Sequence, residues 1–189
     1  MRVCGLVLAA GAGTRFGGPK GLARTTSGDP WVRRAVAMLQ DAGCDEVLVA
    51  VGARGPEVAA LVPPSARAVT AASWADGLAA TLRAGLDAAA RGDAEVLVVT
   101  PVDTPDAPPE AVRRVLDRAA REAATPDDAL ARAVYSGRPG HPVLLGRAHW
   151  GEVRATLTGD AGAGRYLAAR GALAVECGDL WSGHDVDRA

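Results

Sequence analysis

Short apolar segments alternate with amphipathic helical segments along most of the chain, and this alternation constrains its fold more than any other feature. The clearest segments predict strands at 3–9, 46–51 and 94–100 and helices at 31–42 and 108–123. Such an alternation is typical of an α/β fold with a mostly parallel central sheet and helices on both faces. Ligands of these folds bind beyond the carboxyl ends of the strands. We therefore expect the chemistry in the loops after Ala9 and Thr100.

The remaining segments complete this pattern with less regularity. Ser73 and Asp76 have the spacing of a capping box, which predicts a helix that starts at Ser73 and carries one apolar face. That face consists of Leu78, Leu82, Leu86 and Ala89. The other expected elements are a short helix at 56–61, a weaker strand at 66–70, a surface loop at 125–129, two strands within 132–145 around a turn at 137–140, two short helices, and a last strand at 173–177.

Length, charge and cysteine content exclude several classes of protein. The chain has 189 residues and a formal net charge of −1, so we expect residues 1–189 to form one domain. The balanced charge argues against a nucleic acid or a membrane surface as the main partner. The apolar run from Val3 to Ala10 is short for a signal peptide and supplies an expected strand. Cys4, Cys44 and Cys177 form no Cys-x-x-Cys pair, which favours a reducing, cytoplasmic location.

A glycine-rich loop with two basic residues follows the first expected strand. Four glycines between 11 and 18 let the backbone approach a ligand and direct N–H groups toward it, while Arg15 and Lys20 add positive charge. This combination suits a triphosphate. The dinucleotide pattern G-x-G-x-x-G does not fit, because the third glycine, Gly17, comes one position late. The P-loop pattern does not fit either, because Pro19 precedes the lysine and a glycine follows it.

The segment from Leu8 to Lys20 resembles the signature loop of the nucleotidyltransferases that activate molybdopterin and sugar phosphates. It is most similar to the molybdenum cofactor cytidylyltransferase branch, because Ala10 stands where guanylyl-transferring relatives carry glycine. The resemblance implies a Rossmann-like three-layer sandwich of the nucleotide-diphospho-sugar transferase type. It also implies a set of nucleotide-binding residues, namely Leu8, Ala9, Ala10, Gly11, Ala12, Gly13, Arg15, Lys20, Trp74 and Gly77.

Acidic residues at two places resemble the metal ligands of the same family. Asp103 follows the strand at 94–100, and Asp185 and Asp187 lie near the carboxyl terminus. The resemblance implies that Asp103, with Asp185 or Asp187, holds Mg²⁺ or Mn²⁺, since carboxylates suit hard cations beside phosphates. Arg15, Lys20 and Asp103 are then the expected catalytic residues.

Two further motifs resemble stretches of the same family. Gly140, His141 and Pro142 resemble a stretch of the cytidylyltransferase branch that lies near the acceptor, where His141 either donates to the incoming phosphate or serves as a turn residue. Asp160 belongs to a Gly-Asp motif of the family or caps the helix that follows it. Arg165 stands one position late for that motif.

The resemblance implies transfer of CMP from CTP to the terminal phosphate of molybdopterin, with release of pyrophosphate. CTP, a molybdopterin-type acceptor and a recipient molybdoenzyme are the implied partners. The first alternative keeps this chemistry but uses GTP or another nucleotide, or a different phosphorylated acceptor. The others are a dye reductase, since relatives of this branch carry the label nicotine blue oxidoreductase, and a non-catalytic carrier of the cofactor.

Overall fold

The computed structural model describes residues 1–187 and contains one mixed sheet with the strand order β3-β2-β1-β4-β6-β5-β7. Its strands are β1 (Val3–Ala9), β2 (Glu46–Val51), β3 (Arg67–Thr70), β4 (Val96–Pro101), β5 (Leu130–Tyr135), β6 (Arg138–Gly146) and β7 (Leu173–Glu176). The first four strands pair in parallel, and β6 is antiparallel to both of its neighbours, β4 and β5. This confirms the expected mostly parallel sheet.

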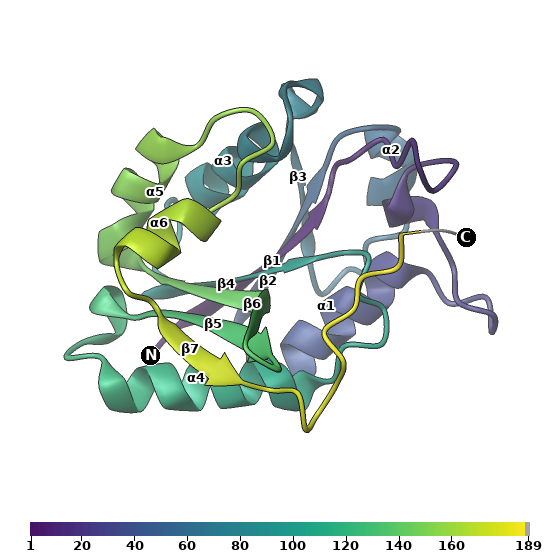
Figure 1. Cartoon of the computed structure of the whole chain (residues 1–189). Coiled ribbons are helices and arrows are strands. Elements are labelled where there is room, and N and C mark those ends of the chain that lie inside the picture. Colours follow the sequence, from purple (N-terminus) through teal and green to yellow (C-terminus); the bar gives the residue numbers. More distant parts are fainter. Residues whose placement is uncertain (188–189) are drawn as a thin grey trace.

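Helices cover both faces of this sheet (Figure 1). One face carries α1 (Trp31–Asp41) and α4 (Pro109–Glu122), and the other carries α3 (Leu78–Ala89), α5 (Trp150–Thr156) and α6 (Gly164–Ala169). The short α2 (Gly55–Ala59) follows β2. The three-layer arrangement expected from the sequence is therefore present. Within the described residues, no helix is long and apolar enough to cross a membrane.

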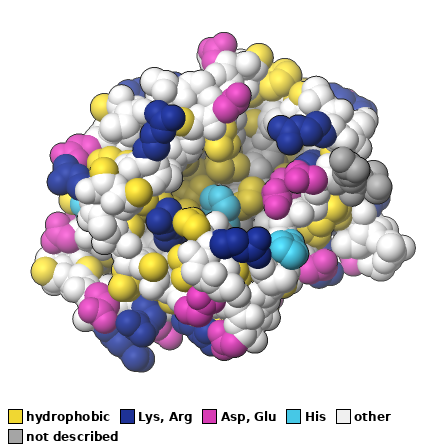
Figure 2. Space-filling model, viewed as in Figure 1, with side chains coloured by type: hydrophobic (Ala, Val, Ile, Leu, Met, Phe, Trp, Pro, Cys, Tyr) yellow, Lys and Arg dark blue, Asp and Glu magenta, His cyan; other side chains and the backbone are white. Residues whose placement is uncertain are grey.

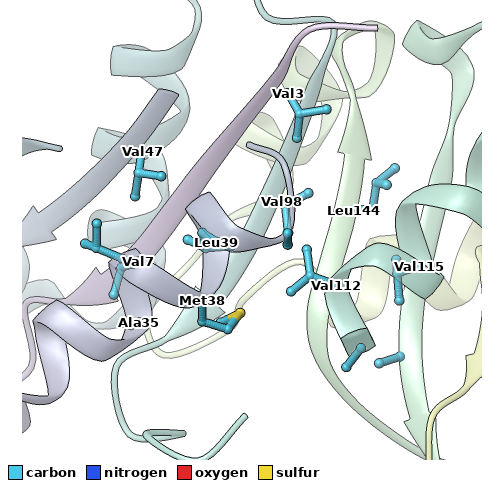
Figure 3. Packing of buried hydrophobic residues seen from close by; sticks show 14 of the residues in the cluster. Val3, Val7, Ala35, Met38, Leu39, Val47, Val98, Val112, Val115 and Leu144 are labelled. Atoms are coloured by element: carbon cyan, nitrogen blue, oxygen red, sulfur yellow. The ribbon is translucent and has the colours of Figure 1, made fainter. Parts of the chain in front are cut away.

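Alternate residues of the central strands supply the two cores. Val7 of β1 and Val98 of β4 pack toward α1 and α4, as Figure 3 shows from close by. Leu6 and Leu97, their neighbours in the chain, pack toward α3 on the opposite face. Each strand thus buries both of its faces, which is why the sequence shows continuous apolar runs instead of strict alternation.

The helix expected from Ser73 begins later, at Leu78. Residues Trp74–Asp76 form a single 3₁₀ turn, and the Ser73 side chain makes no capping hydrogen bond. Gly77 then adopts a φ of 105°, a backbone conformation that cannot belong to a helix, so the capping-box prediction is wrong. Leu78 is 40% exposed as a result, whereas Leu82 and Leu86 are buried as expected.

The hairpin between β5 and β6 also turns earlier than expected. Ser136 and Gly137 form the turn with φ values of 52° and 76°, and Tyr135 pairs with Arg138 across it. Two consecutive residues with positive φ match the right-handed twist of the flanking strands. The turn predicted at 137–140 is therefore wrong, because residues 138–140 already belong to β6.

Gly85 tests how tightly α3 packs on the sheet. A Cβ at this position would lie 2.3 Å from Cδ2 of Leu6, and Leu6 is fully buried, so it has no free space to move into. Alanine favours a helix over glycine by about 1 kcal/mol, but overpacking of a core costs about 1–3 kcal/mol. We expect Gly85→Ala to lower the free energy of unfolding, measured by urea denaturation, by up to about 2 kcal/mol, because the cost of overpacking exceeds the gain in helix preference.

Gly151 in α5 provides the matched control, because a Cβ there would meet nothing within 4 Å. Gly151→Ala should leave the free energy of unfolding unchanged or raise it by up to about 1 kcal/mol. A Gly85→Ala protein as stable as the Gly151→Ala protein would contradict the packing of α3 described above.

Candidate active site

A cleft of about 790 Å³ opens where β1 and β4 end and β6 begins. Figure 2 shows it as a hollow with hydrophobic side chains on its floor and charged side chains around its margin. Residues from the loop after β1, the segment before α3, the β5–β6 hairpin and the loop before α6 line its walls. The cleft lies beyond the carboxyl ends of the parallel strands, where the sequence places the chemistry.

The glycine loop folds back on one of its own carbonyl groups. The carbonyl oxygen of Gly13 accepts hydrogen bonds from the N–H groups of Phe16, Gly17 and Gly18 at 2.9–3.1 Å. Gly13 has a φ of 60°, and a Cβ there would lie 1.9 Å from the oxygen of Gly18, so only glycine fits. Within residues 1–187, the N–H groups from 11 to 15 donate to no backbone carbonyl. They remain available for a ligand.

This turn separates the two cations of the loop. Leu8, Ala9, Ala10, Gly11, Ala12, Gly13 and Lys20 all line the cleft. Arg15 is exposed and is not among the lining residues. The expectation that Arg15 and Lys20 stand at one place is thus not met, because Arg15 lies on the exposed side of the turn that closes on the Gly13 carbonyl.

Lys20 connects the glycine loop to the end of β4. Its Nζ lies 2.8 Å from Oδ2 of Asp103 and 3.4 Å from Oδ1 of Asp187. Burial disfavours the charged amine, but the hydrogen bonds and charges of Asp103 and Asp187 outweigh it and raise the pKa of Lys20. The lysine is therefore charged at neutral pH. Its 17% side-chain exposure keeps it within reach of a ligand in the cleft.

The expected metal ligands are only partly brought together. Among the described residues, no group of three or more acidic, histidine or cysteine side chains gathers around one point, so Asp103, Asp185 and Asp187 form no preformed three-carboxylate centre. Asp103 nevertheless keeps one carboxylate oxygen, Oδ1, buried and without a hydrogen-bond partner. A hard cation held by one or two carboxylates and by substrate phosphates fits this arrangement. Asp187, which also reaches Lys20, fits the second position better than Asp185 does.

The segment before α3 forms a second wall of the cleft. Trp74 packs on Gly52, where a Cβ would lie 2.5 Å from the tryptophan side chain. Gly77 lies against the backbone of Gly159. The Ala79 N–H donates to the Gly159 carbonyl oxygen at 2.9 Å, so the start of α3 does not offer this N–H to a ligand.

His141 lies on the wall formed by β6. Its Nδ1 lies 3.3 Å from the carbonyl oxygen of Val99, and since a carbonyl only accepts, Nδ1 carries the proton. Burial lowers the pKa of His141, although the Val99 carbonyl and the charges of Asp103 and Asp185 partly offset it. The ring is therefore neutral, and its Nε2 is an acceptor. In this tautomer Nε2 accepts a hydrogen bond and does not donate one to an incoming phosphate, so the donor role of His141 stays a prediction.

The segment after β7 supports the motif formed by Gly140, His141 and Pro142. The Tyr135 hydroxyl donates to the carbonyl oxygen of His141 at 2.6 Å, and the Trp181 ring meets the Tyr135 ring edge-on at 5.4 Å. Val186 then donates its N–H to the Asp103 carbonyl oxygen at 2.9 Å. The segment after β7 thus supports both the cleft wall formed by β6 and the loop that carries Asp103.

Similarity to known proteins agrees with this geometry. Residues 5–175 match the family described as the MobA-like NTP transferase domain. The chain belongs to this family. It is 34% identical over 200 residues to the nicotine blue oxidoreductase of Paenarthrobacter nicotinovorans, covering 98% of this chain and 92% of that protein. Nucleotidyl transfer is the activity that the family supports.

Solved structures share the fold over the whole chain. The homologue of Mycobacterium tuberculosis Rv0371c from Mycobacterium sp. strain JC1 is 25% identical, with a TM-score of 0.79 and coverage of 100% of this chain and 92% of that one. The complex of Rv0371c with manganese from M. tuberculosis H37Rv is 24% identical, with a TM-score of 0.70 and coverage of 94% and 88%. These likenesses confirm the Rossmann-like nucleotidyltransferase fold.

Several residues that line the cleft of this NTP transferase were not expected from the sequence. They include Leu78, Thr81, Arg132, Val143 and Leu167, whereas Asp160, which also lines the cleft, was singled out as part of a Gly-Asp motif. Asp160 does not cap α6, which begins after Ala163 without a side-chain cap. Of the expected acceptor residues, Gly140 and His141 line the cleft, whereas Pro142 is buried outside it. An arginine within an apolar strand segment was the one signal that could have identified Arg132.

The lowered pKa of His141 predicts a pH dependence of stability. Below the unfolded-state pKa of about 6.5, the unfolded chain takes up a proton that the buried ring resists, so the native state loses stability as pH falls. His141→Asn keeps an N–H for Val99 but removes the titration. We expect the Tm of the wild type to fall relative to the Tm of this variant as the pH is lowered from 8 to 5. A constant difference would contradict a buried neutral His141.

Proposed function

We propose that this MobA-like NTP transferase moves CMP from CTP to the terminal phosphate of molybdopterin and releases pyrophosphate. The observation that carries the proposal is the ion pair of Lys20 and Asp103 beside the glycine loop. Both residues line the cleft, and Asp103 keeps one carboxylate oxygen without a hydrogen-bond partner. The loop match to the cytidylyltransferase branch, with Ala10 before Gly11, favours CTP over GTP.

The glycine loop and Lys20 would bind the triphosphate. The N–H groups from 11 to 15 are available to donate to phosphate oxygens, and the charged Lys20 adds a compact cation beside them. Fixed donors of this kind stabilise the negative charge that develops on the departing pyrophosphate. The proposed roles of Arg15 are weaker, because its side chain must swing inward from an exposed position to reach the phosphates.

Asp103, together with Asp187, would hold a divalent cation such as Mg²⁺ or Mn²⁺. Such an ion supplies charge neutralisation and draws phosphate oxygens together when it is bound. Asp103 suits this role because its Oδ1 is buried and unpartnered. The backbone bond from Val186 to Asp103 keeps the segment that bears Asp187 close to that carboxylate.

The acceptor would enter along the wall that contains His141. An oxygen of its ionised terminal phosphate forms a bond to the α-phosphorus of CTP, and the bond between the α-phosphorus and the bridging oxygen of pyrophosphate breaks. The acceptor phosphate is already deprotonated, so the reaction needs no general base. Positioning by the cleft and neutralisation of charge are then the main contributions of the protein.

Pyrophosphate release tests the proposal directly. We expect release with CTP only in the presence of molybdopterin and a divalent cation, and much slower release with ATP, GTP and UTP. Faster release with GTP than with CTP would identify GTP as the nucleotide substrate and would contradict the proposed use of CTP. Absence of release with all four nucleotides would contradict nucleotidyl transfer and would favour a carrier of the cofactor.

Variants of the ion pair test the roles of its members. Asp103→Asn should lower the rate of CTP-dependent pyrophosphate release by at least about 100-fold, because the cleft loses the negative charge that would hold the divalent cation. Lys20→Arg should also lower the rate well below that of the wild type, because a planar guanidinium is bulkier than an amine. Asp106→Asn is the matched control, since Asp106 lies in the same loop but is exposed and pairs only loosely with Arg34, at 3.6 Å.

A second candidate function follows from the similarity to nicotine blue oxidoreductase. This relative favours a reductase that would bind a flat dye against the apolar part of the cleft. Within the described residues the cysteines are unpaired, and burial raises the pKa of the Cys4 and Cys44 thiols to about 12, so the thiols themselves are poorly suited to redox chemistry. The discriminating assay adds NADPH and a quinone-like dye to the protein used for pyrophosphate release and follows the absorbance of NADPH.

A further inference from the structure

Arg132 is a half-buried cation that the proposed nucleotide chemistry does not use. It lies on β5 and lines the cleft, and its Nε is buried without a hydrogen-bond partner. Within residues 1–187, no salt bridge joins Arg132 to an acidic side chain. An arginine in this state keeps donors free toward the cleft.

The surroundings of Arg132 raise the cost of leaving it unpaired. Its cross-strand partner on β6 is Val143, and its partner on β7 is Ala174. Val143, Ala163 and Leu167 also line the cleft, and they belong to one buried apolar cluster. A buried donor such as the Arg132 Nε–H costs free energy while it has no partner. An anion that reaches it in these apolar surroundings is bound more strongly than in water.

The position of Arg132 separates it from the triphosphate end. β5 lies two strands beyond β4 in the sheet (Figure 1), and neighbouring strands are about 4.8 Å apart. The strand that carries Arg132 is therefore about 10 Å across the sheet from the strand that leads to Asp103. Lys20, which pairs with Asp103, belongs to the other end of the cleft.

We propose that Arg132 binds an anionic group of the acceptor, a carboxylate or a phosphate, while the apolar body of the acceptor lies against Val143 and Leu167. The planar guanidinium presents paired N–H donors that match the two oxygens of such a group. This inference rests on the proposed function in one respect, that the cleft is the acceptor site. The substrate class it implies is an acceptor with an apolar body and an anionic group at the Arg132 end.

The test follows the Nε–H resonance of Arg132 in ¹H–¹⁵N NMR spectra of the wild-type protein. Phenyl phosphate and benzoate are titrated separately and compared with phenol, which has the same ring without the charge. We expect a saturable shift of the Arg132 signal with at least one anion and none with phenol. The anion that binds more tightly, phenyl phosphate or benzoate, shows whether the anionic group of the acceptor is a phosphate or a carboxylate. No saturable shift with either anion, or an equal shift with phenol, overturns the proposal.

Two variants make the assignment specific. Arg132→Met should bind the effective anion at least about 10-fold more weakly than the wild type, as the loss of a hydrogen bond to a charged group predicts. Arg138→Met is the matched control, since Arg138 lies in the same hairpin but is exposed and outside the cleft. Equal weakening in both variants would show nonspecific attraction and would contradict the proposal.

Nucleotide binding separates this inference from the proposed function. Quenching of tryptophan fluorescence, with Trp74 in the cleft, should show the same CTP affinity in Arg132→Met as in the wild type. Loss of CTP affinity together with anion affinity would show that the variant disturbs the whole cleft, and the proposal would fail on that result. If Arg132→Met does not fold, the wild-type titration still decides. A negative pyrophosphate assay leaves the anion titration interpretable, since the titration requires no turnover.

Discussion

The parallel pairing of β1 with β4 determines where the site can form. In this register Leu8 lies beside Pro101 and Val7 beside Thr100, so both strands end at the same level of the sheet. The glycine loop and the loop that bears Asp103 therefore leave the sheet side by side. Lys20 then needs only the length of its own side chain to meet Asp103. A shift of this register by two residues would move the loops apart by about 7 Å.

The elements that bury apolar residues were predictable, because burial determines both their composition and their spacing. The segment from Val96 to Thr100 could only be a strand covered on both faces, and Asp103 had to follow it at the edge where ligands bind. The start of α3 was not predictable in the same way. It depends on the φ of Gly77, which follows from the close approach of Gly159, a residue more than 80 positions away. Local capping patterns carry no information about such a contact.

The directions of side chains within loops could not be predicted from the sequence either. Arg15 and Lys20 are five residues apart and equally basic, yet one is exposed and the other lines the cleft. The difference arises from three N–H groups that converge on the Gly13 carbonyl, a geometry that composition does not reveal. Arg132 escaped the sequence analysis for a related reason. Its significance depends on partners that are missing among the described residues, and a sequence does not show which pairs fail to form.

The ion pair at Lys20 has a consequence for covalent chemistry at the site. Lys20 is the one lysine of the chain, since arginine accounts for the other basic side chains. An acylating reagent that needs a neutral amine would find that side chain both charged and partly shielded by Asp103. The rate at which such a reagent modifies Lys20 is therefore set by how often the pair opens. Slow labelling of this kind, followed at Lys20, would report the opening of the site without any change to the sequence.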